Sequence, residues 1–282
     1  METKIKNSSL EAVIKHQGAE LFSLKKDGEN LLWDIDTRFW NKTSPVLFPI
    51  VGALKEDSFF YQGEKYPLTI HGFARDMEFK IKEQKEDFVS FFIESNEETK
   101  KKFPFDFILE ISYLLKGDSL HITYTITNPS NGELWYSIGA HPAFALDGKL
   151  DEFSLEFDSQ EKVISYQLDN RIVTGKTFDI LLENNRFDLN IDLFDYDTLI
   201  FKNYTTSQVT LSKGDSKVLK VEFPDFPFLG IWTKKDASYI CIEPWLGVAD
   251  HADHNQKLTE KEGIRKLDSG QSESFTFSIT GY

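Results

Sequence analysis

The chain has 282 residues, of which 46 are acidic and 32 basic, so its formal net charge at pH 7 is −14. This negative charge argues against nucleic acid and anionic membranes as partners, because both attract basic patches. The single cysteine, Cys241, excludes an internal disulfide and is typical of a reducing compartment. Residues 1–20 contain no apolar stretch of the kind found in signal peptides. We therefore expect a cytoplasmic protein, monomeric or homodimeric, that binds a neutral or small ligand.

Short apolar segments separated by turn residues follow one another from the start of the chain. Residues 10–14 and 20–24 predict two strands, and Asp27-Gly28 predicts a tight hairpin turn because glycine accepts positive φ. Residues 107–115 and 119–127 predict a longer hairpin. In its second strand apolar residues alternate with polar ones, which is typical of a half-buried antiparallel strand.

Strand-like segments continue to the end of the chain, at residues 133–138, 153–157, 199–202, 209–211, 218–223, 229–232, 238–243 and 274–280. Helix signals are confined to residues 95–102 and 178–185, each long enough for about two turns. Because no linker or repeat divides the chain, we predict a single domain over residues 1–282. The predicted fold class is all-β, a large antiparallel β-sandwich of two extended sheets packed face to face.

The central segment, residues 137–144, places His141 where a predicted strand meets a loop. Pro142 restricts the preceding residue to extended geometry, so the backbone of His141 is predicted to be held in place. Histidine gains and loses a proton near neutral pH, which suits an acid or base catalyst. The alternative is a histidine at the end of a sheet that hydrogen-bonds only its neighbours.

Two further segments place polar chemistry beside glycine, proline or aromatic residues. Glu243 follows an apolar run and precedes Pro244-Trp245, where poor solvation would raise the carboxyl pKa toward the range of a useful base. His71 and Arg75 lie four residues apart around a glycine, which predicts a loop. The donor fork of Arg75 suits hydroxyls, carboxylates or phosphates. The alternatives are a surface glutamate at a strand end and an arginine paired with a nearby acid.

Residues 250–254 hold two aspartates and two histidines, which are residue types that bind metals. No further ligands stand at a recognisable spacing, so we expect a solvated loop near the rim of a pocket, with no metal. Glycine-rich nucleotide loops and the GxSxG elbow of hydrolases are absent from the sequence. Cys241 has no evident histidine partner in the sequence, which argues against a cysteine nucleophile.

Taken together, these segments resemble the aldose 1-epimerase (galactose mutarotase-like) family, especially its bacterial branch encoded beside lactose and galactose genes. The resemblance extends over nearly the whole chain, through residues 45–52, 71–75, 139–144, 197–201, 229–232 and 241–245. It implies a supersandwich fold with a sugar site in a cleft on one sheet. It also implies interconversion of the α and β anomers of an aldohexose such as galactose, without metal or cofactor.

The resemblance implies a role for five residues. Glu243 would act as the base on the C1 hydroxyl, and His141 as the acid on the ring oxygen. His71 and Arg75 would bind hydroxyls or polarise the ring oxygen. Asp197 would grip the sugar hydroxyls. Proton removal at one oxygen with delivery at the other is what opening of a pyranose ring requires.

Several alternatives stay open at this point. Asp195 is an alternative to Asp197 as the hydroxyl-binding acid. Many relatives carry an arginine where this chain has Ala53, and Lys55 or Arg75 are the candidates to replace it. Ala53 also leaves open a non-catalytic sugar-binding or sugar-sensing domain.

The sugar itself is also open. A hexose-6-phosphate mutarotase would need a cluster of cations; Arg75 and the pair Lys234-Lys235 give it little support. A sugar lyase or hydrolase would need a second carboxylate near Glu243. Three aromatic residues could stack on a sugar, although core packing is expected for at least two of them: Phe144, Trp232 and Trp245.

Overall fold

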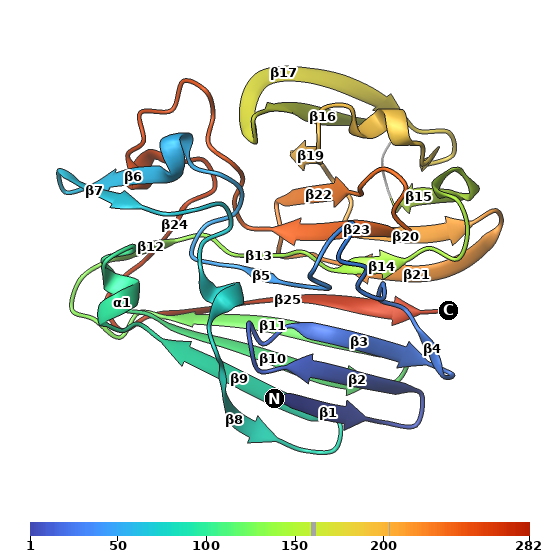
Figure 1. The fold of residues 1–282 in the computed structure, drawn as a ribbon, viewed down its shortest axis with the longest axis horizontal. Helices are drawn as coiled ribbons and strands as arrows, with labels where there is room; N and C mark the ends of the chain where they lie inside the picture. The colour runs from blue at the N-terminus through green and yellow to red at the C-terminus, as the bar shows by residue number, and fades with distance from the viewer. Residues whose placement is uncertain (159–161, 203) are drawn as a thin grey trace.

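The structure is a computed structural model that describes residues 1–158, 162–202 and 204–282 (Figure 1). Almost all of its regular structure is β, as predicted. One large sheet has nine antiparallel strands. In spatial order they are β18 (Arg186–Asp188), β15 (Phe153–Phe157), β20 (Gln208–Lys213), β21 (Ser216–Glu222), β25 (Ser272–Gly281), β11 (Ser119–Thr127), β10 (Ile108–Lys116), β9 (Phe88–Glu94) and β8 (Lys80–Gln84).

The second large sheet has eight strands. Along its main path they are β17 (Ile172–Leu181), β16 (Lys162–Asp169), β19 (Leu199–Lys202), β22 (Phe228–Trp232), β23 (Tyr239–Trp245), β13 (Gly139–Ala140) and β5 (Val46–Leu47), while β14 (Ala143–Ala145) pairs with β23 off this path. In both sheets the described strands pair antiparallel, and in Figure 1 β22 and β23 run above β25 and β11.

Smaller elements complete the fold. The smaller sheets are β1 (Glu2–Lys6), β2 (Leu10–Lys15), β3 (Leu21–Lys26) and β4 (Glu29–Asn30); β6 (Ser58–Tyr61) with β7 (Glu64–Pro67); and β12 (Leu134–Tyr136) with β24 (Arg265–Leu267). The described helices are α1 (Glu97–Lys100) and the short 3-10 turns η1 (Lys55–Asp57), η2 (Ala74–Asp76), η3 (Leu150–Glu152), η4 (Ile191–Phe194) and η5 (Leu258–Glu260). None of these described helices has the length and apolar character needed to cross a bilayer.

The two large sheets share one hydrophobic core. In β11 the buried residues alternate with half-exposed ones, and Ile122 and Tyr124 face inward. They belong to the same buried cluster as Ile231 of β22 and Ile242 of β23. Side chains on the inner faces of the two sheets therefore interdigitate, which confirms the predicted sandwich.

The local predictions had mixed outcomes. The long hairpin is β10–β11, and the short helix within residues 95–102 is α1, which a capping box between Asn96 and Thr99 begins. The second helix, predicted at 178–185, is wrong. Residues up to Leu181 belong to β17, and they pair with β16 through hydrogen bonds that a local sequence pattern does not reveal.

Candidate active site

Five side chains from distant parts of the chain meet at one cavity of about 250 Å³. They are the five residues to which the resemblance gives roles, namely His71, Arg75, His141, Asp197 and Glu243. Asp195, the alternative to Asp197, lines a neighbouring groove instead. Ala53 also lines the cavity, whereas Lys55 does not. The fold therefore gathers the predicted residues in one place, which is necessary for the roles that the resemblance implies.

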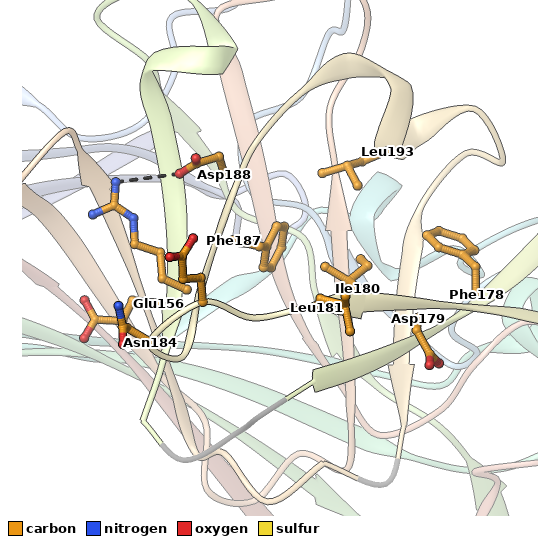
Figure 2. Close-up of a pocket in the computed structure, with 11 residues that line it drawn as sticks. Glu156, Phe178, Asp179, Ile180, Leu181, Asn184, Phe187, Asp188 and Leu193 are labelled. Atoms are coloured by element: carbon orange, nitrogen blue, oxygen red, sulfur yellow. Dashed lines mark ion pairs between the residues drawn. The ribbon is translucent and has the colours of Figure 1, made fainter.

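A larger hollow of about 810 Å³ lies elsewhere, beside β17 and β18 (Figure 2). Apolar side chains such as Phe187 and Leu193 line it together with acids at its margin. An ion pair of 3.7 Å joins Arg186 and Asp188 there (Figure 2). None of the five residues lies in this hollow. We therefore place the candidate active site in the smaller cavity.

The centre of the smaller cavity is the pair His141 and Glu243. Glu243 lies on β23, and β13 and β14 both pair with β23 on either side of the His141 loop. This double pairing brings the His141 Nε2 atom to 3.4 Å from the Glu243 Oε2 atom. The histidine side chain is 11% exposed and the glutamate side chain only 1%. The prediction that Pro142 helps to hold His141 agrees with this arrangement, because the Pro142 carbonyl accepts a bond from the Ile242 amide.

The alternation of β23 explains why a glutamate points into the cavity. Ile240 and Ile242 face the core, so Cys241, Glu243 and Trp245 share the opposite face. The Trp245 ring fits between two glycines of the neighbouring strands. A Cβ atom on Gly139 or Gly230 would lie 2.6 Å or 2.5 Å from that ring. These glycines therefore let the indole lie flat against the sheet as part of the cavity wall.

Burial decides the protonation of the central pair. It raises the pKa of Glu243 well above its usual value; the charge of Asp197 adds to this effect and the Trp245 indole opposes it. Burial also lowers the pKa of His141 to about 3, and the Arg75 cation acts in the same direction. Both shifts favour the uncharged form, that is, a carboxylic acid beside a neutral imidazole.

Several polar atoms of the site have no partner in the described part of the chain. Both carboxyl oxygens of Glu243, the Nδ1 atom of His141 and the Nε1 atom of Trp245 are buried without a hydrogen bond. Buried polar atoms in folded proteins are normally hydrogen-bonded, because an unpaired one costs free energy. A cluster of such atoms around one cavity is therefore suited to a ligand with several hydroxyl groups.

His71 lies on a loop whose backbone is fixed from both sides. Its φ is 65°, its amide donates to the Gly52 carbonyl, and its carbonyl accepts from the Phe48 amide. Gly72 is required at the next position, because a Cβ there would lie 2.3 Å from the Phe48 carbonyl oxygen. The Gly52 amide donates to the His71 Nδ1 atom at 3.1 Å. Burial lowers the pKa of His71, which favours the neutral ring. Because Nδ1 accepts the bond from Gly52, the proton of the neutral ring lies on Nε2, which can donate it.

Arg75 and Asp197 complete the polar lining. One guanidinium nitrogen of Arg75 donates to the Ile70 carbonyl at 2.9 Å, and its Nε atom lies 3.8 Å from an oxygen of Asp76. Asp197 stands in a turn with φ of 72°, and the Thr198 hydroxyl donates to it at 3.3 Å. Each side chain keeps further hydrogen-bonding capacity, as the fork of an arginine and the two oxygens of a carboxylate allow.

Aromatic rings form one side of the cavity. The ring centroids of Trp40 and Trp232 lie 4.8 Å and 5.6 Å from that of His141. Of the three aromatic residues considered from sequence, Phe144 packs in the core, whereas Trp232 and Trp245 line the cavity. Trp245 is nevertheless only 4% exposed and packs in a buried apolar cluster, so core packing is found for Phe144 and Trp245, as expected for at least two of the three. Trp40 was missed because it lies in a loop; its only sequence signal is a Phe-Trp pair within polar residues.

The residues that could hold a metal differ from those considered in the sequence. Ligand atoms of His141, Cys241 and Glu243 lie within 4.8 Å of one another. Cys241 thus has a histidine neighbour that the sequence did not reveal. Burial raises the pKa of the Cys241 thiol, and the charge of Glu243 adds to this effect, so the thiolate that a metal or a nucleophile requires is disfavoured. The trio therefore fits a metal poorly.

The segment 250–254 was expected to be a solvated loop, and this is wrong for its first residue. Asp250 is 2% exposed, and its Oδ1 atom accepts a bond of 3.0 Å from the buried Lys261 amine. His251 lies against Glu262, and His254 lies 3.2 Å from Asp250. These pairs of acids and bases therefore hold the loop of residues 250–254 in place beside the cavity.

Comparisons with known proteins identify the family of the chain. The family model for aldose 1-epimerase matches residues 1–279. "Protein LacX, plasmid" of Lactococcus lactis subsp. lactis is 32% identical over 299 aligned positions, covering 99% of this chain and 99% of that protein.

Two crystal structures are similar over their full length. The galactose mutarotase related enzyme from Lactobacillus acidophilus has a TM-score of 0.95 and 31% identity, covering 100% of this chain and 97% of that one. A galactose mutarotase-like protein from Lactobacillus casei ATCC 334 has the same TM-score of 0.95 and 31% identity, with 100% of both chains covered. The match of sequence and fold over the whole length leads to one conclusion: this chain belongs to the aldose 1-epimerase family.

Proposed function

We propose that the cavity binds an aldohexose and catalyses the interconversion of its α and β anomers. The observation that carries this proposal is the pair His141 and Glu243, 3.4 Å apart, buried and without other partners. Anomer exchange requires one group to take a proton from the C1 hydroxyl and another to give a proton to the ring oxygen. Glu243 serves as the base and His141 as the acid in this proposal.

The pair holds one proton, and the sugar decides where that proton lies. Hydroxyl groups that donate to Glu243 favour its carboxylate form, so the proton moves to His141. Ring opening then transfers the C1 hydroxyl proton to Glu243 and the imidazolium proton to the ring oxygen. This step returns both groups to the uncharged forms that burial favours. The free energy of desolvating two charges is thus recovered as the C1–O bond to the ring oxygen breaks.

Ring closure reverses the transfer. The open-chain aldehyde rotates about the C1–C2 bond, Glu243 gives its proton to the aldehyde oxygen, and His141 removes the proton from the attacking hydroxyl. The Nε2–H group of His71 and the free donors of Arg75 face the cavity and are suited to hold sugar oxygens during both steps. Trp40 and Trp232 present faces on which the apolar side of a sugar can stack. No electrons are gained or lost overall, so the reaction needs no redox cofactor.

The test is polarimetry of freshly dissolved α-D-glucose and α-D-galactose with the purified protein. We expect the approach to equilibrium to be faster with protein than in buffer, in proportion to protein concentration. A rate equal to that of buffer for every aldohexose tried would contradict the proposal.

A non-catalytic sugar-binding domain is the second candidate, and Ala53 is the observation that favours it. The resemblance implies an arginine at this position, and the alanine that lines the cavity here supplies no side-chain donor. Saturable quenching of tryptophan fluorescence by a sugar, without any acceleration of mutarotation, would select this second candidate.

A further inference from the structure

The hairpin between β16 and β17 carries an arginine where its backbone favours glycine. Asp169 pairs with Ile172, so the turn consists of Asn170 and Arg171 alone. Their φ values are 49° and 69°, the pattern of a type I′ turn, in which Asn-Gly is preferred. A side chain with a Cβ at the second position is strained. An arginine there therefore suggests that the guanidinium has a use other than folding.

The turn is held over the cavity by contacts along the hairpin. The Val173 amide donates to the Asp250 carbonyl at 2.9 Å, and the Ala252 amide donates to the Val173 carbonyl at 3.0 Å. Behind it, the Lys202 amine lies 4.2 Å from the centre of the Tyr166 ring. Figure 1 shows β16 and β17 at the outer end of the sheet that contains β19 and β22. These contacts fix the place of the turn, and Arg171 lines the same cavity as Ala53 and His71.

Arg171 is a cation of this region whose whole guanidinium group is available to a ligand. The Lys55 amine donates to the carbonyls of Ala252 and His254. Arg75 is bonded to the Ile70 carbonyl. In the described part of the chain, no hydrogen bond or ion pair engages the guanidinium of Arg171. Of the cations near Ala53, therefore, Lys55 is occupied and Arg171 offers a full set of donors.

The charges around the cavity act at different places. The Arg171 cation contributes to the lowered pKa of His71, after burial, His141 and Arg75. The Asp197 carboxylate contributes to the raised pKa of Glu243. The His71 side of the cavity thus lies near two arginines, and the Glu243 side lies near an acid. A positive region of this kind stands out in a chain whose net charge is −14.

We propose that Arg171 is a specificity-determining residue that selects aldoses carrying an anionic substituent, a phosphoryl or a carboxylate group. Guanidinium groups bind both anions through two parallel hydrogen bonds, and Arg171 has these donors free. This inference rests on the proposed function, because it names the substrate class of the same cavity. It also explains how a cavity with Ala53 can hold its sugar without the arginine of other family members.

The experiment measures binding and turnover separately for D-glucose, D-glucose 6-phosphate and D-glucuronate. Binding is followed by quenching of tryptophan fluorescence, and anomer exchange by two-dimensional exchange NMR. The proteins are the wild type, Arg171→Gln, Arg171→Gly and the control Lys176→Gln, which removes an exposed cation from the same hairpin away from the cavity. Arg171→Gly distinguishes a loss of binding from a loss of folding. Glycine fits the turn and is expected to leave Tm equal to or above that of the wild type.

We expect the wild type to bind at least one anionic sugar about tenfold or more tightly than glucose. This ratio should fall toward one in both Arg171 variants and stay unchanged in Lys176→Gln. Preference for the phosphate alone, or for both anions, would distinguish the two kinds of substituent. Equal binding of the three sugars by the wild type, or a ratio that survives Arg171→Gly, would overturn the inference.

The two proposals fail in different ways in this experiment. Anomer exchange without any preference for an anionic sugar would overturn the role of Arg171 and leave the mutarotase intact. Selective binding that depends on Arg171, without acceleration of anomer exchange, would support the role of Arg171 in ligand selection and contradict catalysis.

Discussion

Two pairs of buried ionisable groups lie close to the cavity, and they differ in the number of their hydrogen-bonding partners. Lys261 and Asp250 are each 1% exposed at the side chain and lie 3.0 Å apart. The Lys261 amine also donates to the Val248 carbonyl, and the second oxygen of Asp250 accepts from the Lys55 amide. His141 and Glu243 are comparably buried, but their remaining polar atoms have no partner among the described residues.

The pKa shifts follow this difference. Burial acts to raise the pKa of Asp250, yet Lys261 and the Lys55 amide together hold it below its usual value. The pKa of Glu243 is raised instead, because the cavity supplies little to offset burial. The comparison teaches that burial alone does not make a catalytic acid. A buried charge with complete partners stabilises structure, whereas one left without them is free to exchange protons with a ligand.

The largest expected effect is on turnover. We expect Glu243→Gln and His141→Asn each to lower kcat/KM for anomer exchange by roughly 10² to 10⁴-fold, since each removes a proton-transfer group. The double variant should be little worse than the poorer single variant, because the two groups act as one unit. The measurement is exchange NMR at several sugar concentrations. Additive losses in the double variant would show that the residues act independently.

The next effect is on stability, and it concerns the other pair. Lys261→Met leaves the Asp250 charge buried without its main partner, which we expect to cost about 3 to 5 kcal/mol in the free energy of unfolding. The control is Lys266→Met, because Lys266 pairs with Glu133 and Asp268 at the surface, where ion pairs contribute little, and its loss should matter much less than that of Lys261. Urea denaturation monitors both. Equal losses of unfolding free energy in the two variants would contradict the claim that the buried pair of Lys261 and Asp250 stabilises the structure.

Glu243→Gln should also make the protein more stable at a pH above the raised pKa of Glu243. The folded-state pKa of Glu243 is above the unfolded value, so the folded state holds the proton more tightly. The stability that this group contributes is present at low pH and is lost as pH rises through the folded pKa. The gain from glutamine, which cannot ionise, must therefore grow with pH. Denaturation curves at about pH 5 and about pH 8 measure it, and an equal gain at both would be contrary to a raised pKa.

The smallest expected effect is the response of turnover to mild acid. His141 has its pKa lowered to about 3, so a second proton enters the pair only far below neutrality. We expect kcat/KM not to fall as the pH drops from about 7 to about 5, because His141 takes up no proton there, and to fall as the pH rises through the raised pKa of Glu243 and the single proton of the pair is lost. A decline centred near the usual histidine pKa of about 6.5 would contradict the lowered pKa.

The sequence predicted those parts of the fold whose signal is local. The alternation in β11 and the glycine turn before it define one hairpin without outside help. The site residues were found because each stands in a short segment with family character, such as the one around His141. Their assembly into one cavity depends on β13 and β14 pairing with β23, which the sequence does not display.

What the sequence missed depends on distant partners. The turn that carries Arg171 is defined by the pairing of β16 with β17, which the sequence does not display, so Arg171 went unnoticed. Asp250 was misjudged because its neutralising partner, Lys261, comes eleven residues later in the chain. A buried charge is recognised only together with the group that compensates it.

The most direct test of the account is the exchange rate between α and β anomers of an aldohexose at equilibrium, measured by magnetisation transfer. The wild-type protein and the Glu243→Gln variant are compared at equal concentration. They differ only in that an amide nitrogen replaces one carboxyl oxygen in the buried pair. The account predicts fast exchange with the wild type and a rate near that of buffer with the variant. Equal acceleration by both proteins would contradict the claim that the unpartnered pair of His141 and Glu243 moves the protons.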